Sequence, residues 1–309
     1  MKLAAECFNK VKIDCLNFIR SQESKTDKFK NKERMIKSFL IPLCFWINKK
    51  ADIKRPYFVG LAGGQGTGKT TISSLIKIIL IKYFKLKVFR ISIDDFYKTR
   101  KERVALSKKI HPMLLTRGVP GTHDINMMLS FFRKAKSKKF KRLKLPTFNK
   151  AIDDRFNKKN WYDLKIKPDV IIFEGWCVGA KAEKNITLNK TINSMEKAKD
   201  QNQIWRKYVN QQLKSKYKNL YSQLNCLIYL KANSFNLLQK WRLKQERKLW
   251  LSSKRKINLK IMSKGDVINF MQTYQRITQN MFRHAPKYAS IILNLNANHQ
   301  IKSAIYKKR

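Results

Sequence analysis

The chain has 309 residues, of which 43% are hydrophobic and 11% aromatic, and its 69 Lys and Arg against 20 Asp and Glu give a formal net charge of +49. This composition supports a large buried core and excludes wholesale disorder. The charge predicts attraction to polyanions at low salt. The lysines are scattered among many Asn, Ile and Phe, so we interpret the charge as compositional drift and expect no specific nucleic-acid partner.

Two helical patterns open the chain. Apolar residues recur at helical spacing over residues 1–20, and a second pattern runs to about Asn48. We predict that residues 1–50 form a helical extension packed on the core and that residues 51–309 form one main domain. The most apolar early stretch, 39–47, is far shorter than the roughly 20 residues of a membrane span. With no visible signal peptide and five dispersed cysteines, we expect a cytoplasmic protein with no membrane partner.

Short apolar runs alternate with helical patterns through the rest of the chain. The runs predict strands at residues 57–62, 87–93, 170–173, 227–230 and 290–293. The helical patterns cover residues 70–84, 203–218, 235–250 and 266–282. Continuous apolar strands between helices predict an α/β fold in three layers, with a mainly parallel central sheet covered on both faces.

The segment between the first strand and its helix fits the pattern G-x-x-x-x-G-K-[ST] completely. It comprises Gly63, Gly64, Gln65, Gly66, Thr67, Gly68, Lys69 and Thr70. Glycines let successive backbone N–H groups turn toward phosphate oxygens, and the following helix adds its positive N-terminal dipole. We predict that Lys69 bridges the β- and γ-phosphates of ATP, that Thr70 binds Mg²⁺, and that Thr71 lies beside the same phosphates.

Carboxylates end two of the predicted strands. Asp94 and Asp95 follow the second strand, and Glu174 follows the third. Ligands of open parallel sheets bind outside the carboxyl ends of the strands, so these side chains are predicted to lie near the phosphates. We assign Asp94 as the base that accepts the proton of the substrate hydroxyl, with Asp95 as a second candidate or a helix N-cap. Glu174 is a predicted Mg²⁺ ligand, and Asp94 is a further candidate for that role.

Five segments in a fixed order carry a more specific resemblance. They are the glycine loop and residues 92–97, 117–124, 150–155 and 173–179. Together they resemble the plant-type D-glycerate 3-kinases and their bacterial and fungal relatives, a group within the set that holds uridine kinase, phosphoribulokinase and bacterial pantothenate kinase. The similarity runs from about Tyr57 to the C-terminus. It implies a P-loop NTPase fold with a helical lid, and phosphorylation of the 3-hydroxyl of D-glycerate by MgATP.

The resemblance also implies acceptor-site residues. Asp94 matches the general base of the family, and His123, Asp124 and Arg155 fall on segments that line the acceptor site in the wider group. Arg155 or Arg117 can hold the carboxylate of glycerate bidentately, while His123 and Asp124 can bond its hydroxyls. The competing interpretation makes His123 a loop brace and Asp154 with Arg155 a surface ion pair.

Residues 241–247 occupy the place of the lid helix in such kinases. Arg242, or with less support Arg247, can close over the transferred phosphoryl group. The chain departs from the family pattern at Asn149, where we expect an acidic residue.

Two alternatives stay open. The same fold can phosphorylate a nucleoside, pantothenate or a sugar phosphate, and Tyr97, Phe148 and Trp176 are available to stack on a base. A nucleic-acid-associated P-loop ATPase is the more distant alternative, motivated by the net charge, although we find no helicase-type motif series.

Overall fold

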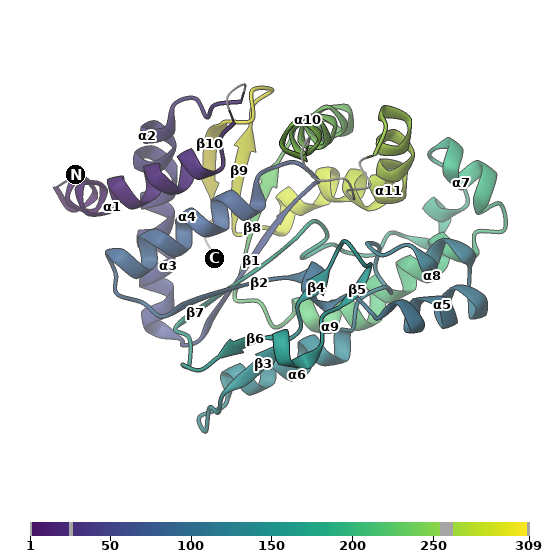
Figure 1. Ribbon diagram of the computed structural model, residues 1–309, viewed down its shortest axis with the longest axis horizontal. Helices are drawn as coiled ribbons and strands as arrows, with labels where there is room; N and C mark the ends of the chain where they lie inside the picture. The colour runs from purple at the N-terminus through teal and green to yellow at the C-terminus, as the bar shows by residue number, and fades with distance from the viewer. Residues whose placement is uncertain (1, 25–26, 254–261, 308–309) are drawn as a thin grey trace.

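The computed structural model describes residues 2–24, 27–253 and 262–307 and is an α/β fold built around one six-stranded sheet (Figure 1). The strand order is β10-β9-β8-β1-β7-β2, and every neighbouring pair is parallel except β9 and β10. The strands are β1 (Tyr57–Gly63), β2 (Val88–Ser92), β7 (Val170–Gly175), β8 (Cys226–Lys231), β9 (Ile291–Leu295) and β10 (Ile301–Tyr306). The predicted mainly parallel sheet is therefore confirmed.

Two small antiparallel sheets lie outside the central one. They pair β3 (Leu143–Leu145) with β6 (Tyr162–Leu164), and β4 (Phe148–Asn149) with β5 (Asp154–Arg155). The sequence analysis did not anticipate these pairs or β10. Their strands are short or largely exposed, so they lack the continuous apolar run that marks a buried strand.

Eleven α-helices occur in the described residues. They are α1 (Lys2–Ser21), α2 (Lys32–Met35), α3 (Ile41–Ile53), α4 (Lys69–Lys82), α5 (Arg100–Lys109), α6 (Ile125–Lys136), α7 (Ser194–Lys199), α8 (Ile204–Gln212), α9 (Lys218–Tyr221), α10 (Phe235–Ser253) and α11 (Lys264–Tyr288). Two π-helical turns, Ile36–Leu40 and Leu213–Tyr217, join α2 to α3 and α8 to α9. Short 3₁₀ turns at Ile93–Phe96, Pro112–Leu115, Lys158–Asn160 and Asn185–Leu188 complete the fold.

The pleat of β1 divides the core into two layers. Val59 and Leu61 point into one cluster with residues of α1, α3 and α4, whereas Phe58 and Ala62 join the other with residues of α6 and α11. Successive side chains of a strand face opposite sides of the sheet, so an all-apolar strand must be covered on both. Figure 1 shows α3 and α4 on one side of the sheet and α6 and α9 on the other.

The N-terminal helices share the core of the sheet domain. Cys7, Val11 and Cys15 of α1 are buried in the same cluster as Ile76 of α4. Burial of a side chain of this size stabilises the fold by about 1.5–3 kcal/mol. The division of the chain at residues 50 and 51 into an extension and a main domain stays a prediction.

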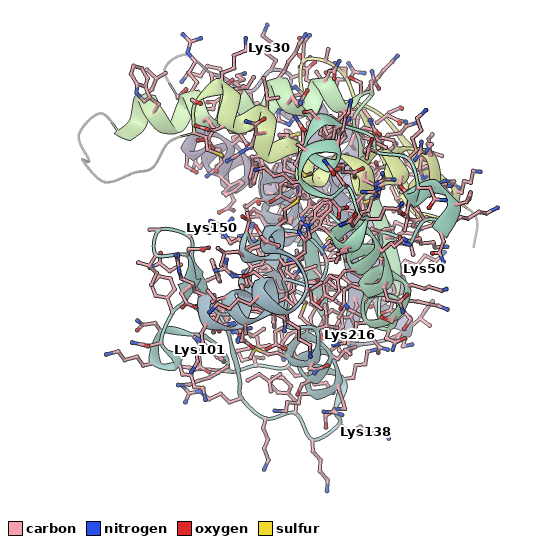
Figure 2. The ribbon with its side chains drawn as sticks, turned by 90° about the vertical axis from the view of Figure 1, so that its right-hand side faces the viewer. Lys30, Lys50, Lys101, Lys138, Lys150 and Lys216 are labelled. Atoms are coloured by element: carbon pink, nitrogen blue, oxygen red, sulfur yellow. The ribbon has the colours of Figure 1, made fainter. Side chains whose placement is uncertain are left out.

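The basic side chains spread over the whole molecule. The labelled lysines of Figure 2, among them Lys30, Lys101, Lys138 and Lys216, come from different segments of the chain. All five cysteines are buried, and none forms a disulfide. Within the part of the chain that the structure describes, no helix is both long and apolar enough to cross a bilayer.

The register of three strands brings the predicted site residues to one edge of the sheet. β7 lies between β1 and β2, and Glu174 of β7 aligns with Leu61 of β1 on one side and with Ser92 of β2 on the other. The glycine loop follows β1 directly, and Asp94 and Asp95 lie in the 3₁₀ turn that follows β2. The three segments therefore meet at the carboxyl ends of adjacent parallel strands.

Candidate active site

The glycine loop closes tightly on itself. Gly66 and Gly68 have φ of 78° and 81°, the left-handed region that favours glycine. The Thr67 hydroxyl donates to the Gly64 carbonyl at 2.8 Å. Gly66 has a second constraint, since an added Cβ would lie 2.8 Å from the Cβ of Trp241 in α10. The loop thus combines a curled backbone with close contact to the predicted lid helix.

Lys69 is the half-buried cation of this loop. Its Nζ donates to the carbonyls of Gly63 and Gly64 at 2.9 and 3.0 Å. Burial lowers the pKa of Lys69, and the carboxylates of Glu174 and Asp94 oppose that effect. A half-buried ammonium flanked by backbone N–H groups and a helix N-terminus strongly favours an anionic ligand.

Glu174 joins the loop helix to the sheet. Its carboxylate accepts hydrogen bonds from the hydroxyls of Thr70, at 3.2 Å, and Ser73, at 3.0 Å. Arg90 of β2 lies beside this pair: its Nη1 donates to the Thr70 carbonyl and to the Ser74 hydroxyl and lies 3.9 Å from Glu174. The structure therefore brings two of the predicted Mg²⁺ ligands together.

The donor set at Thr70 and Glu174 fits a cation whose other ligands come from phosphate and water. Mg²⁺ prefers six oxygen ligands and is usually held in proteins by one or two side chains with substrate phosphates and waters. Across the described residues, no group of three His, Cys, Asp or Glu side chains is arranged to hold a metal by itself. Both carboxylate oxygens of Asp94, the third candidate ligand, accept hydrogen bonds from other side chains.

Asp94 is held between two donors. The Tyr97 hydroxyl donates to its Oδ1 at 2.9 Å, and the Lys150 ammonium donates to its Oδ2 at 3.0 Å. Burial raises the pKa of Asp94, but Lys150, His123 and Tyr97 together outweigh burial and hold the pKa below its ordinary value. The carboxylate is consequently ionised and ready to accept a proton at neutral pH.

Asp95 has the opposite environment. Its carboxylate accepts from the backbone N–H of Ser92 at 3.3 Å, while the Ser92 hydroxyl caps the same turn. Burial, with a smaller contribution from Asp94, raises the pKa of Asp95 to about 6. Asp95 thus completes a capping box at the start of the 3₁₀ turn, close to the N-cap alternative considered for it.

The predicted acceptor arginines both have protein partners. Arg155 donates to the Tyr97 carbonyl at 2.7 Å and to Asp124 at 3.2 Å, which ties the two loops together. Asp124 also caps α6 through the N–H of Met127. Arg117 pairs with Asp153 and lies 5.3 Å from the ring centroid of Phe148. The ion pair of Arg155 is therefore with Asp124 and not with Asp154, and the Arg155 side chain is only 10% exposed.

His123 lies inside the protein. Its ring stacks on Tyr97 with centroids 4.6 Å apart, and its Nδ1 lies 2.6 Å from the Tyr217 hydroxyl. Its Nε2 has no hydrogen-bond partner among the described residues. Burial lowers the pKa of His123 to about 4, so the imidazole is neutral at pH 7.

The predicted lid segment, residues 241–247, lies in α10 and contacts the glycine loop. Trp241 stacks on His299 of the β9–β10 turn, with centroids 4.3 Å apart and 10° between planes. Arg242 pairs with Glu246 one helical turn later and lies over the ring of Phe270 at 5.7 Å. Arg242 is thus placed beside the loop.

Sequence reasoning missed several residues of this site. Lys150 was read only as part of a motif, Arg90 as part of a strand, and His299 not at all. Tyr274 of α11 also reaches the site, where its ring packs on Trp176. A helical pattern shows which residues face the core, but not that one of them meets a segment far earlier in the chain.

Comparisons with known proteins agree with this geometry. No family model matches the sequence. The chain is 31% identical over 230 residues to the uncharacterized kinase mug58 of Schizosaccharomyces pombe, a match that covers 71% of this chain and 79% of that protein. The chain belongs to the glycerate 3-kinase-like family of P-loop kinases. It is therefore a phosphotransferase acting on a small molecule, and its relatives imply ATP as the donor.

Two further relatives of this kinase carry a more specific name. The chloroplastic D-glycerate 3-kinase of Arabidopsis thaliana is 27% identical over 227 residues, which cover 67% of this chain and 47% of that protein. The solved structure of D-glycerate 3-kinase from Cryptococcus neoformans superposes with a TM-score of 0.74 at 21% identity, covering 87% of this chain and 99% of that one. The latter likeness concerns the fold.

Proposed function

We propose that this kinase transfers the γ-phosphoryl group of MgATP to the 3-hydroxyl of D-glycerate. The observation that carries the proposal is the position of Asp94, an ionised carboxylate fixed between Tyr97 and Lys150 within electrostatic reach of Lys69. A base placed beside a phosphate-binding lysine is what in-line transfer to an alcohol requires. The names of the Arabidopsis and Cryptococcus relatives support glycerate as the alcohol.

The residues divide the reaction between them. Backbone N–H groups of the glycine loop and Lys69 bind the β- and γ-phosphates. Asp94 accepts the proton of the acceptor hydroxyl. The hydroxyl oxygen bonds to the γ-phosphorus while the bond from that phosphorus to the β,γ-bridging oxygen breaks, leaving ADP. Arg242 on α10 stabilises the charge of the transferred group once it leaves Glu246.

Thr70 and Glu174 would hold Mg²⁺, directly or through a water. When bound, the metal would supply positive charge that neutralises the charge developing on the phosphate oxygens. Arg90 contacts Ser73 and Glu174 and helps to keep both in place. The protein part of the site thus matches the small share of ligands that Mg²⁺ takes from a kinase.

The acceptor side is basic. Arg117 and Lys150 lie on the two segments next to Asp94, and their side chains are 28% and 63% exposed. Glycerate is a small anion, and a guanidinium binds a carboxylate through two parallel hydrogen bonds. An anionic acceptor therefore fits this side better than a neutral nucleoside.

An acceptor panel with purified protein and MgATP tests the proposal. We expect turnover with D-glycerate at least tenfold above that with pantothenate, uridine or a sugar phosphate, a difference that one charged hydrogen bond supplies. The Lys69→Ala variant is the control for contaminating kinases. Turnover with uridine or pantothenate and none with glycerate would replace glycerate by that acceptor.

A further inference from the structure

Tyr274 is a polar side chain in the site for which the mechanism above has no use. It is 4% exposed, and it stands on α11, far along the chain from the segments of Gly118 and Trp176 that it contacts. Its ring is packed on two sides, against Trp176 and Phe270. A protonated tyrosine hydroxyl in a binding site can donate a hydrogen bond to a bound ligand.

Three contacts place this hydroxyl at the acceptor side. The ring meets Trp176, which follows Glu174 and Gly175, edge to face at 4.7 Å. It also meets Phe270 at 4.8 Å, the ring over which Arg242 lies. The third contact is with the loop that carries Arg117.

That third contact is the tightest. A Cβ built on Gly118 would lie 2.2 Å from the Tyr274 oxygen, and Gly118 has φ of 138°. Two features thus restrict this position to glycine: its backbone conformation and the Tyr274 hydroxyl that lies over it. Because Arg117 precedes Gly118 directly, the hydroxyl and the guanidinium belong to one small region of the site.

We propose that Tyr274 binds the acceptor. Its hydroxyl donates a hydrogen bond to the anionic group of the acceptor, the same group that the Arg117 guanidinium binds. The hydroxyl lies over Gly118, next to Arg117 in the sequence, and the charges of Asp94, Arg117 and Arg242 all act on it. Burial raises the pKa of Tyr274, so the group stays protonated and can donate. The chemistry that it recognises is a carboxylate or another small anion.

The proposal deepens the proposed function and rests on it for the identity of the acceptor. Tyr274→Phe should raise the KM for glycerate about tenfold, the effect of one hydrogen bond to a charged group, and leave the KM for ATP and the melting temperature unchanged. Tyr229→Phe is the matched control, because Tyr229 is a buried tyrosine of β8 outside the site. It should change neither KM.

A double-mutant cycle with Arg117→Gln separates binding from structure. If both side chains hold one anion, the two losses are not additive, and the double variant should be about as weak as Arg117→Gln alone. Fully additive effects, an unchanged KM for glycerate in Tyr274→Phe, or equal rises in both KM values with a lower melting temperature would each overturn the proposal.

The identity of the acceptor is judged separately. If the wild-type protein phosphorylates another anionic acceptor and not glycerate, the proposed function fails, and the same KM ratio measured with that acceptor decides the role of Tyr274. If the acceptor proves to be uncharged, with no anion for the hydroxyl to bind, both proposals fail.

Discussion

The ion pair between Lys150 and Asp94 allows a direct test of the base assignment. Replacing Lys150 by Met removes the charge and keeps much of the stem. The Nζ and Oδ2 atoms are 3.0 Å apart, and the lysine side chain is 63% exposed. At that distance the attraction is about 1.4 kcal/mol at the dielectric constant of bulk water, and one pKa unit corresponds to about 1.36 kcal/mol. The high exposure makes the bulk-water value the appropriate one.

The sign of the effect follows from the role of the group. A base works deprotonated, so activity falls as the pH drops through its pKa. Lys150 lowers the pKa of Asp94, so its removal should move the acid limb of the pH profile upward by about one pH unit. The measurement is kcat/KM for the acceptor at saturating ATP. The pH runs from roughly 3.5 to 9, a range that includes the ordinary pKa values of Asp and His.

The wild-type profile discriminates between the two aspartates. If Asp94 is the base, the acid limb lies at or below the ordinary range of an aspartate, whereas Asp95 would place it near 6. Lys138→Met, which removes an exposed lysine far from the site, is the charge control (Figure 2). An acid limb that Lys150→Met leaves in place, or one near pH 6 in the wild type, would refute Asp94 as the base.

Three further changes follow from the same contacts. Lys69→Ala should abolish turnover and preserve the melting temperature within a few degrees, since its nitrogen bonds only the loop carbonyls; residual full activity would contradict the loop assignment. Asp95→Asn should stabilise the protein at pH 8 by on the order of 1 kcal/mol in urea unfolding, with no gain below pH 4, because a raised folded pKa makes ionisation unfavourable to the fold. Arg276→Met should destabilise by about 3–5 kcal/mol, since it strands the buried carboxylate that it bonds on Glu196; a loss below 1 kcal/mol would argue against a buried pair.

Much of the sheet and of the phosphate site could be predicted because the information is local. An apolar run of β1 followed by glycines, Lys69 and an apolar helix needs no distant partner to be recognised. The ends of β2 and β7 were placed beside this loop by one rule of parallel sheets, and the register of Glu174 with Leu61 and Ser92 follows it.

The acceptor side could not be predicted in the same way. Lys150 bonds to Asp94, which lies 56 residues earlier in the chain. Asp153, in the same segment as Lys150, forms an ion pair with Arg117. In a sequence with 69 basic residues, nothing marks which lysine faces inward. Tyr274 was hidden for a related reason, because its apolar neighbours in α11 make it read as one more core residue of an amphipathic helix.

The pair Asp94 and Asp95 shows how neighbouring identical residues acquire different chemistry. The 3₁₀ turn after β2 directs Asp95 back to the Ser92 N–H, where burial raises its pKa to about 6, and directs Asp94 to two donors that lower its pKa. Two titratable groups whose environments push their pKa values apart are the usual mark of divided roles. Asp95 takes up a proton first as the pH falls, and its neutralisation removes the like charge beside Asp94. Lys150 and Tyr97 keep Asp94 ionised into acid, where the neutral Asp95 places no like charge beside the proposed base.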